Sequence, residues 1–350
     1  MIQTLCEQWT RFAFMPLSLG CATIDPVTTP VDVAPAGIKQ VEAGQAEASH
    51  EISPTSRYIS RTFQSPQGSL AYKLYIPASY SEQDSALVVM LHGCGQSADD
   101  FANGTAMNTH AEQAGCLVMY PEQTAFGMPG GCWNWFDKAH QQRDGGDAGL
   151  IAGATREVVG EFGVPADNVF VAGLSAGAAM AVVLGNTYPD IYAAVGCHSG
   201  LPHGCAGDTS TALQVMRNGV SMQDASLLTG SGVPVIVFHG DNDQTVHVAN
   251  GHTVIEHSLS AACANDAQGP AAVKEVGVSQ GRDFTRVVHR SAGGTVVAEH
   301  WVIHGAGHAW SGGNSRGSYA DEKGPSASEE MLRFFRDVRQ VRQERYVAAA

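Results

Sequence analysis

Short apolar runs alternate with longer helix-like segments along most of this chain. The runs are "ALVVMLHG" (86–93), "CLVMYP" (116–121), "NVFVAG" (168–173), "YAAVGCHSG" (192–200), "PVIVFHGDND" (234–243) and "EHWVIHGAGH" (299–308). A continuous apolar run is typical of a strand buried on both faces of a sheet. Strands that alternate with helices predict an α/β fold with a mostly parallel sheet and right-handed crossover connections.

The composition and texture of the chain suggest one main domain. Of the 350 residues, 44% are hydrophobic and 15% are charged, which is typical of a chain that folds around a core. Residues 23–56 contain no aromatic residue and no clear period, so they can bury little apolar surface. We therefore expect an N-terminal leader over residues 1–56, a single α/β domain over residues 57–340 and a C-terminal tail over residues 341–350.

The charge of the chain argues against two classes of partner. The formal net charge is −14 and there is no run of Lys or Arg, which argues against binding to nucleic acid or anionic membranes. No apolar run reaches the ~20 residues that span a bilayer.

The segment "RFAFMPLSLGCA" (11–22) resembles a signal peptide. It is an imperfect one, because Pro16 interrupts its apolar stretch and the acidic Glu7 lies upstream. We expect a secreted or periplasmic protein, with a cytoplasmic location as the alternative.

A serine between two glycines separates a predicted strand from a predicted helix, in the stretch Gly173-Leu174-Ser175-Ala176-Gly177. The serine could simply cap the helix. The small residues two positions to each side favour a nucleophile elbow, in which the serine is strained and the glycines let strand and helix approach. The helix N-terminus would then direct its dipole and free N–H groups at the reaction centre.

A nucleophilic serine needs a histidine base and an acid that orients the base. Asp241 and Asp243 follow one apolar run, and His308 lies in a glycine-rich loop after another. The order Ser, Asp, His is that of α/β-hydrolases. We prefer Asp243 as the acid, because in such hydrolases the acid lies several residues beyond the strand end, and we expect Asp241 to hold the turn.

The turn "HGCGQ" (92–96) supplies the remaining part of such a site. A His-Gly turn after an early strand is where these hydrolases place a backbone N–H group that faces the oxyanion. We assign the two oxyanion donors to the N–H groups of Cys94 and Ala176. His92 would brace the loop rather than act as a base.

Local signals predict the boundaries of several helices. Asp99 or Asp100 would cap a helix that runs to about Ala114. Further helices are expected near 149–162 and 248–263, and a closing helix within 325–343 has its apolar residues on one face. Gly293-Gly294 predicts a hairpin turn between two strands.

The cysteines divide into three groups. Cys116 is expected to be a buried free thiol in a strand. Cys94 and Cys132 both lie in glycine-rich loops and are the best candidates for a disulfide, and Cys197 and Cys205 could also pair. No C-x-x-C spacing occurs, so a zinc ribbon is not expected.

Five segments closely resemble the poly(3-hydroxybutyrate) depolymerase family of esterases, and the likeness extends from about residue 57 to residue 339. They are "LHGCGQSADDFANGTAMNTHAEQAGCLVMYPEQ" (91–123), "CWNWF" (132–136), "GLSAGAAMAVVLGNTYPDIYAAVGCHSG" (173–200), "HGDNDQTV" (239–246) and "GAGHAWSGG" (305–313). The resemblance implies an α/β-hydrolase fold in which Ser175 is the nucleophile, Asp243 the acid and His308 the base.

The same resemblance implies a disulfide between Cys94 and Cys132 that ties the oxyanion loop to the tryptophan loop. No metal ion or organic cofactor is expected for such a site. Secreted polymer depolymerases of this kind usually append a linker and a polymer-binding domain, and we expect neither within this sequence.

Aromatic residues near the predicted site suggest how a substrate is held. We predict that Trp133 and Trp310 line a cleft for an acyl chain or a phenolic ring, with Asn134 and Gln96 as weaker candidates for hydrogen bonds to substrate. Trp135 is at least as well explained as a packing anchor.

The remaining histidines and acidic residues do not indicate a metal site. His247, His252 and His257 are spaced by five, which spreads them around a helix instead of along one face. The stretch "DND" (241–243) lacks the glycine and the distal glutamate of a calcium-binding loop.

The sequence therefore predicts a serine ester hydrolase that cleaves hydroxyalkanoate polymers or oligomers through an acyl-enzyme. A feruloyl or acetylxylan esterase of the same fold is the main alternative, and a general short-chain esterase is another. A non-catalytic protein of this fold would commonly lack a member of the triad, and all three are present here. The sequence carries no signal for an oligomeric state.

Overall fold

The computed structural model describes residues 55–349, apart from 82–84, 124–129, 222–229, 231, 263 and 265–268. The predicted leader and its candidate signal segment lie outside the described residues, except for residues 55 and 56. The described strands are β1 (Arg57–Ser65), β2 (Gly68–Ile76), β3 (Leu87–Leu91), β4 (Leu117–Glu122), β5 (Val169–Leu174), β6 (Ala194–His198), β7 (Val235–Gly240), β8 (Ala271–Ser279), β9 (Arg282–Arg290), β10 (Val296–Ile303), β11 (Trp310–Ser311) and β12 (Ala320–Asp321). The described helices are α2 (Ala98–Thr105), α3 (Met107–Ala114), α4 (Gly146–Phe162), the 3₁₀ helix η1 (Ala166–Asn168), α5 (Ala176–Thr187), α6 (Thr209–Asn218), α8 (Ala249–Ala262) and α9 (Ala327–Ala349).

Within the described chain, ten strands form one sheet in the order β1-β2-β4-β3-β5-β6-β7-β10-β9-β8. The six central strands, β4 to β10 in this order, run parallel, and antiparallel pairs extend the sheet at both edges. The central strands correspond to the apolar runs of the sequence, which explains why nearly all of their residues are buried. The predicted, mostly parallel α/β sheet is confirmed.

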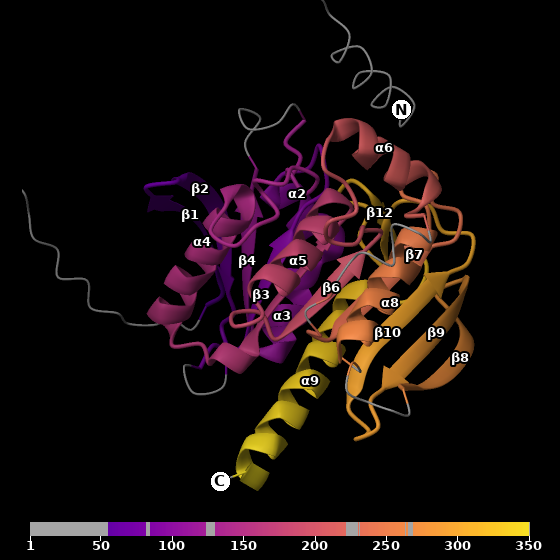
Figure 1. The fold of residues 1–350 in the computed structure, drawn as a ribbon. Coiled ribbons are helices and arrows are strands. Elements are labelled where there is room, and N and C mark those ends of the chain that lie inside the picture. The colour runs from indigo at the N-terminus through magenta and orange to yellow at the C-terminus, as the bar shows by residue number, and fades with distance from the viewer. Residues whose placement is uncertain are drawn as a thin grey trace, which may run out of the picture. The chain divides into compact units, whose positions relative to one another are not determined.

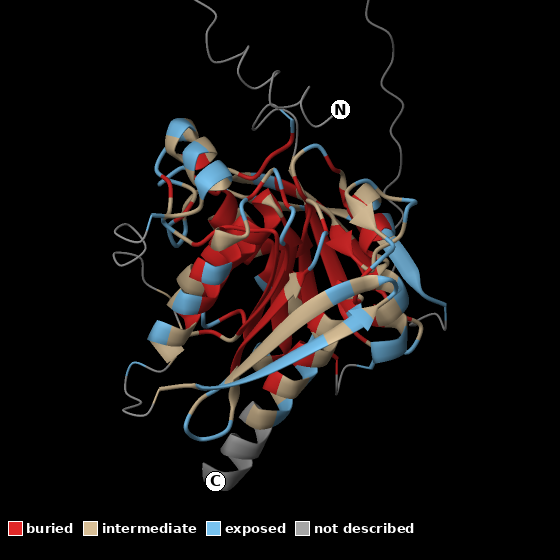
Figure 2. Ribbon diagram, turned by 90° about the vertical axis from the view of Figure 1, so that its right-hand side faces the viewer, coloured by how far each residue is buried: buried red, intermediate tan, exposed pale blue. Residues whose placement is uncertain are grey.

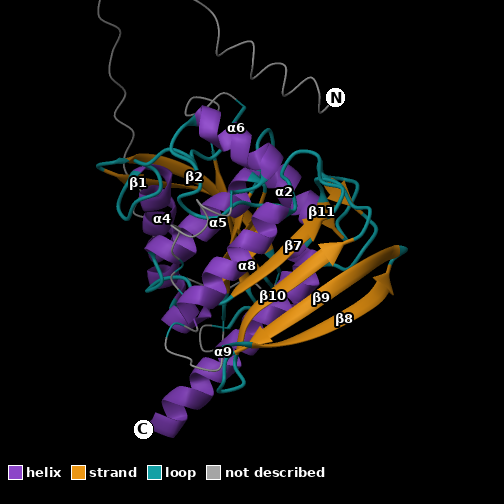
Figure 3. Ribbon diagram, turned by 45° about the vertical axis from the view of Figure 1, so that its right-hand side comes forward, coloured by secondary structure: helices purple, strands orange, loops and turns teal. Residues whose placement is uncertain are grey.

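Helices cover both faces of this sheet (Figures 1 and 3). Helices α4, α5 and α8 pack against one face, and α2, α3 and α9 pack against the other. The parallel register aligns Leu91 of β3 with Gly173 of β5, and Gly173 with Cys197 of β6. The loops that follow these strands therefore begin at the same level and gather at one edge of the sheet, where ligands bind in open α/β folds.

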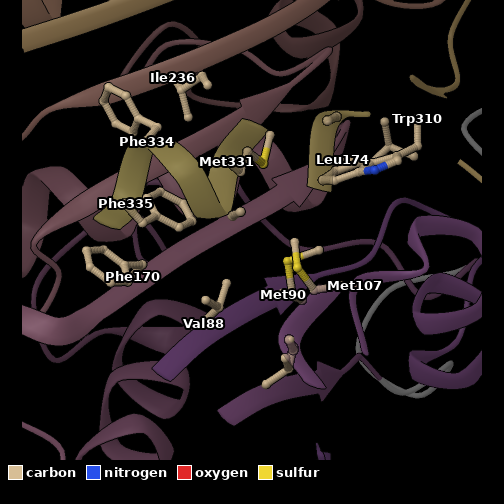
Figure 4. Packing of buried hydrophobic residues seen from close by; sticks show 14 of the residues in the cluster. Val88, Met90, Met107, Phe170, Leu174, Ile236, Trp310, Met331, Phe334 and Phe335 are labelled. Carbon is tan, nitrogen blue, oxygen red and sulfur yellow. The ribbon is translucent and has the colours of Figure 1, made fainter. Parts of the chain in front are cut away.

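The closing helix α9 packs its apolar face onto the sheet (Figure 4). Met331, Phe334 and Val338 are at most 5% exposed, and Phe335 stacks on Phe170 of β5 with ring centroids 4.6 Å apart. These are the positions that the sequence spacing predicts for the buried face. The helix continues to Ala349, so residues 341–349 extend α9 and do not form a separate tail. No helix among the described residues has an apolar stretch long enough to cross a membrane.

The helix predicted from Asp99 or Asp100 to about Ala114 is two helices in the structure. Ser97 caps α2, because its side chain accepts the N–H of Asp100. Ala106 adopts a left-handed conformation with φ of 51°, which ends α2 and starts α3 in a new direction. A single alanine carries no sequence signal for such a break.

Strand β8 is an edge strand that the sequence analysis did not predict (Figure 2). Its side chains are mostly exposed on both faces, including Val273 at 61% and Val276 at 70%. An edge strand with two solvated faces needs neither a continuous apolar run nor an alternation, so it has no clear pattern. The neighbouring hairpin between β9 and β10 turns at Gly293-Gly294, as predicted.

Two of the three cysteine predictions agree with the structure. Cys94 and Cys132 form a disulfide, and Cys116, next to strand β4, is a buried free thiol. The suggested pair of Cys197 and Cys205 is wrong, because both are free thiols. Cys197 is fully buried within β6, whereas Cys205 lies in the loop beyond the strand.

Burial in the sheet keeps three histidines neutral. It lowers the pKa of His198 and His300 to about 3 and that of His239 to about 4. A histidine in an unfolded chain has a pKa near 6.5. As the pH falls, the unfolded state therefore takes up protons first, and the folded state loses stability from about pH 6.5 down to the folded-state values.

The variant His300→Phe tests this account of acid stability. We expect the free energy of unfolding of the wild type to fall between pH 7.5 and 4.5. The fall should be about 2 kcal/mol smaller in His300→Phe, because one buried histidine no longer takes up a proton on unfolding. Urea denaturation at the two pH values measures both changes, and equal pH dependence in the two proteins would contradict the account.

Candidate active site

Ser175 lies in a strained turn between β5 and α5. Its backbone has φ of 58° and ψ of −120°, a conformation that a residue other than glycine rarely adopts. Its N–H donates a 2.9 Å hydrogen bond to the carbonyl of His198, at the end of the neighbouring strand β6. The side chain is half-buried at the N-terminus of α5. This is the strand–turn–helix geometry that the Gly-x-Ser-x-Gly spacing predicts.

Two glycines allow the turn because no side chain fits at either position. A Cβ atom on Gly177 would lie 2.1 Å from the carbonyl oxygen of Leu91 on β3. A Cβ atom on Gly173 would lie 2.5 Å from the backbone carbon of Gly177. Helix α5 therefore approaches strands β3 and β5 more closely than any residue with a side chain would permit.

Asp243 and His308 form a hydrogen-bonded pair beyond the ends of β7 and β10. The Oδ2 atom of Asp243 lies 2.7 Å from Nδ1 of His308, and Oδ1 accepts the N–H groups of Thr245 and Val246 at 2.9 Å each. The side chain of Asp243 is fully buried and that of His308 is 6% exposed. Both carboxylate oxygens of Asp243 are therefore engaged in hydrogen bonds, which hold the imidazole of His308 in one orientation. In this orientation Nε2 is available to take a proton.

The carboxyl group of Asp243 stays ionised despite its burial. Burial alone would raise its pKa, but the hydrogen bond and charge of His308, with smaller contributions from His239 and the N–H of Val246, bring the pKa below its ordinary value. A buried carboxylate beside the imidazole can stabilise the imidazolium that forms when His308 takes a proton.

Asp241 plays a different part from Asp243. Its Oδ2 atom lies 2.7 Å from Nδ1 of His304, and its Oδ1 atom accepts the N–H of Gly305 at 2.7 Å. These contacts join the turn after β7 to the turn after β10. The expectation that Asp241 holds the turn agrees with this geometry.

His198 joins the serine turn to the histidine loop, a role that the sequence analysis missed. Its carbonyl accepts the N–H of Ser175, and its Nε2 atom accepts the N–H of Ser311 at 3.0 Å. The ring stacks on Trp310, with centroids 5.1 Å apart. Its low pKa keeps the ring neutral, so one ring nitrogen carries no proton and Nε2 can act as this acceptor. The stretch "GCHSG" at a strand end is the only sequence signal for it.

The oxyanion loop after β3 lies against the serine turn. A Cβ atom on Gly93 would be 3.7 Å from the Cβ of Ser175, and the N–H of Gly93 is held by Oε1 of Gln96 at 2.9 Å. Within the described residues, the N–H groups of Cys94 and Ala176 have no hydrogen-bond acceptor. These are the two donors that the sequence analysis assigned to the oxyanion hole.

His92 and the disulfide brace this loop. Nδ1 of His92 donates to the carbonyl of Gly93 at 2.9 Å, and Nε2 accepts the N–H of Gln123 at 3.1 Å. With both ring nitrogens occupied and the ring buried, His92 holds the loop in the way that was predicted for it. The bond between Cys94 and Cys132 brings their Cα atoms to 4.4 Å and ties the tryptophan loop to the oxyanion loop.

Two of the aromatic residues predicted to line a cleft lie in the core. Trp133 is 0% exposed and donates its Nε1 proton to the carbonyl of His92, and Trp310 is 1% exposed and donates to Ser328. Because their faces and their polar atoms are covered, these indoles pack beneath the site and do not form its wall. Trp135 is also buried, as a packing anchor would be.

The two polar candidates for substrate contacts are also engaged within the protein. Gln96 is 7% exposed, and its amide binds Gly93, Asp100 and Ser318. Asn134 is half-buried, and both its backbone and side-chain N–H groups donate to Asp147. No local sequence pattern indicates that these two amides hold loops in place.

Asp147, at the start of α4, holds the tryptophan loop and was missed by the sequence analysis. Besides the hydrogen bonds from Asn134, Asp147 accepts one from the side-chain amide of Gln123. Its Oδ1 atom lies 3.2 Å from Nδ1 of His140. Burial would raise its pKa, but His140 and the N–H groups of Asn134 bring the pKa below its usual value. An acidic residue in the first turn of a helix is too common to single out from sequence.

The described residues contain no group of three or more His, Cys, Asp or Glu side chains placed to hold a metal ion. What they bring together at the sheet edge is a strained serine, an imidazole oriented by a buried carboxylate and two free N–H groups. Such a set can transfer a proton, form a covalent bond to a carbonyl carbon and stabilise a developing oxyanion.

A pair of glycine variants tests whether close packing holds the serine turn. Gly177→Ala should lower the free energy of unfolding by at least about 2 kcal/mol, because the methyl group would overlap the backbone of β3. Gly160→Ala, on the exposed side of α4 with open space around it, should raise it by up to about 1 kcal/mol. Urea denaturation of both variants gives the two values, and similar small changes would contradict the packing argument.

Comparison with known proteins shows the family of the chain. The sequence profile described as "Esterase PHB depolymerase" matches residues 70–278, more than half of the chain. The poly(3-hydroxyalkanoate) depolymerase C of Paucimonas lemoignei is 30% identical over 69% of this chain and 58% of its own length. Feruloyl esterase B of Talaromyces funiculosus is 29% identical over 49% of this chain and 48% of its own.

A third relative, the probable acetylxylan esterase A of Aspergillus fumigatus, is 26% identical over 61% of this chain and 60% of its own. The chain thus spans about half to three fifths of the length of these three relatives. Among solved structures, the acetyl xylan esterase from Aspergillus awamori aligns with a TM-score of 0.61 at 20% identity, over 81% of this chain and 99% of that chain. This likeness confirms the predicted α/β-hydrolase fold, and the profile match shows that the chain belongs to the PHB depolymerase family of esterases.

Proposed function

We propose that this protein is a serine ester hydrolase that cleaves poly(3-hydroxybutyrate) or hydroxyalkanoate oligomers through an acyl-enzyme. The observation that carries the proposal is the hydrogen bond between Asp243 and His308, at the edge of the sheet where Ser175 occupies a strained turn. Membership of the PHB depolymerase family of esterases and the similarity to a poly(3-hydroxyalkanoate) depolymerase support the substrate class.

In the proposed first step, Nε2 of His308 takes the proton of the Ser175 hydroxyl as its oxygen attacks the ester carbonyl. Nδ1 of His308 is already bonded to Asp243, so the ring presents Nε2 and the charge that it gains is stabilised by the carboxylate. His308 then gives the proton to the leaving alcohol, and an acyl-enzyme remains on Ser175. Water, activated by the same imidazole, releases the acid.

The negative charge of the tetrahedral intermediate falls on the former carbonyl oxygen. The N–H groups of Cys94 and Ala176 are the proposed donors, since neither has an acceptor among the described residues. Ala176 is the first residue of α5, so the helix dipole adds to the stabilisation. One such donor is worth about 3 kcal/mol of transition-state stabilisation in serine hydrolases.

We also propose that the enzyme works in an oxidising compartment, as a secreted or periplasmic protein would. The disulfide between Cys94 and Cys132 supports this, because it holds a loop of the proposed site and disulfides persist mainly outside the cytosol. In a reducing compartment the proposed oxyanion loop would lose this tether.

A feruloyl or acetylxylan esterase is the second candidate, since relatives of both names match the chain at 26–29% identity. Product analysis with amorphous poly(3-hydroxybutyrate), methyl ferulate and acetylated xylan in parallel separates the two. We expect the wild type to release 3-hydroxybutyrate and its oligomers, and Ser175→Ala to release none. Release of ferulate or acetate alone would move the substrate to plant cell-wall esters and leave the mechanism unchanged.

The same experiment addresses a non-catalytic protein of this fold. If wild type and Ser175→Ala behave alike on all three substrates and on p-nitrophenyl acetate, Ser175 only starts a helix and the catalytic proposal fails. Circular dichroism of both proteins checks that the serine variant is folded.

The two aspartates after β7 provide a matched test of the acid. Asp243→Asn should lower kcat by about 10³–10⁴, because the amide no longer stabilises the imidazolium of His308. Asp241→Asn should change kcat by less than about tenfold, because an amide oxygen can still accept the N–H of Gly305. Steady-state kinetics on one soluble ester measures both, and equal losses would remove the distinction between the two residues.

A further inference from the structure

We propose that Tyr319 contacts the alcohol part of the ester and sets the enzyme's selectivity for that part. This inference rests on the proposed esterase function and deepens it. Tyr319 is only partly buried, so it can give the site an aromatic wall that the buried Trp133 and Trp310 do not provide.

Tyr319 stands against the proposed base. Its ring packs edge-on to that of His308, with centroids 6.4 Å apart and planes at 79°. Tyr319 is half-buried, so part of its surface is open to a ligand, whereas the side chain of His308 is only 6% exposed. The carbonyl oxygen of Tyr319 accepts a hydrogen bond from the N–H of Trp310 at 2.7 Å. This bond ties Tyr319 to the residue that lies two positions after His308 in the chain.

The backbone of Tyr319 is strained, with φ of 50°. Six described residues other than glycine have a positive φ. Two of them belong to the proposed site or its support: Ser175 itself, and Ser199, which directly follows His198. A large aromatic residue in this region is a true outlier, and such strain tends to be kept where it positions a functional side chain. At Tyr319 the ring of the strained residue lies beside that of His308.

Hydrogen bonds from the oxyanion side of the site hold this strained segment. The N–H of Ser318 donates to Oδ1 of Asp100 at 2.9 Å, and the amide of Gln96 donates to the carbonyl of Ser318 at 3.0 Å. The other end of the same amide accepts the N–H of Gly93 in the oxyanion loop. One buried side chain therefore fixes Tyr319 and the proposed oxyanion loop relative to each other.

The chemistry of the proposed reaction decides which part of the substrate the ring meets. His308 gives its proton to the oxygen of the leaving alcohol, so that alcohol must lie beside the imidazole when the ester bond breaks. The acyl part is attached to Ser175, on the side of α5. A ring that packs against His308 is therefore next to the alcohol, and it would favour bulky or apolar alcohols by direct contact.

Two series of esters separate the alcohol side from the acyl side. The first is methyl, phenyl and 2-naphthyl acetate, in which only the alcohol varies. The second is methyl acetate, butyrate and octanoate, in which only the acyl chain varies. The quantity compared is the ratio of kcat/KM between variant and wild type for each ester, because this ratio cancels the intrinsic reactivity of the leaving group.

Three variants make the comparison. Tyr319→Gly removes the ring and relieves the positive φ, so the backbone is not put under new strain. Tyr319→Phe keeps the ring and removes the hydroxyl. Gln280→Gly relieves a similar φ of 45° at an exposed residue in the turn between β8 and β9, and serves as the control.

We expect Tyr319→Gly to lower kcat/KM about tenfold more for 2-naphthyl acetate than for methyl acetate, and to change the acyl series uniformly. Gln280→Gly should stay within about twofold of the wild type on every ester. Tyr319→Phe keeps the ring, so its loss of kcat/KM should not differ between 2-naphthyl acetate and methyl acetate. A selective loss in the acyl series, or an equal loss on all esters, would overturn the inference. Thermal melting of each variant checks that it is folded.

A binding measurement separates failure of this inference from failure of the proposed function. The probe is 2-naphthol, the alcohol part of 2-naphthyl acetate. It is titrated into Ser175→Ala and into Ser175→Ala/Tyr319→Gly, and its fluorescence reports binding. The measurement requires no catalytic turnover by either protein. A dissociation constant about fivefold higher without the ring supports the contact, even if the wild type hydrolyses no ester and the esterase proposal falls. Equal dissociation constants would overturn the contact, whatever the enzyme hydrolyses.

Discussion

The approach of helix α5 to strand β3 is the contact on which the proposed site depends. Gly177 sits so close to the carbonyl of Leu91 that any side chain would overlap it. This contact forces the chain to turn sharply out of β5, and the turn puts Ser175 in a conformation that costs energy. Packing of the buried helix and strands around the turn offsets that cost. The strained conformation of Ser175 therefore depends on the packing of the central sheet.

Buried histidines at strand ends connect the loops of the site. His92 holds the oxyanion loop, His198 joins the serine turn to Ser311, and His239 donates to the carbonyl of Val246 near the proposed acid. Each is buried, and burial lowers the pKa of all three, so they remain neutral. Neutral rings can hold loops through fixed hydrogen bonds without adding positive charge beside His308, whose own protonation the proposed reaction requires.

Loops from distant parts of the chain also depend on single buried amides and carboxylates. Gln96 links the oxyanion loop to Ser318, and Asp147 anchors the loop that carries Trp133. The disulfide between Cys94 and Cys132 joins these two regions covalently. The proposed oxyanion donors, the base and the ring of Tyr319 thus belong to one connected framework, in which movement of any loop is resisted by the others.

Local sequence patterns were enough to predict the central sheet and the order of the proposed triad, because continuous apolar runs and a Gly-x-Ser-x-Gly turn have few physical solutions. They also indicated the roles of Asp241 and His92. They did not reveal strand β8, the break at Ala106, the free thiols of Cys197 and Cys205 or the burial of the two tryptophans. The exposure of a side chain and the pairing of cysteines depend on which distant segments cover a residue, so local patterns do not predict them. For the same reason the ring beside His308 belongs to Tyr319, a residue that no local pattern distinguishes.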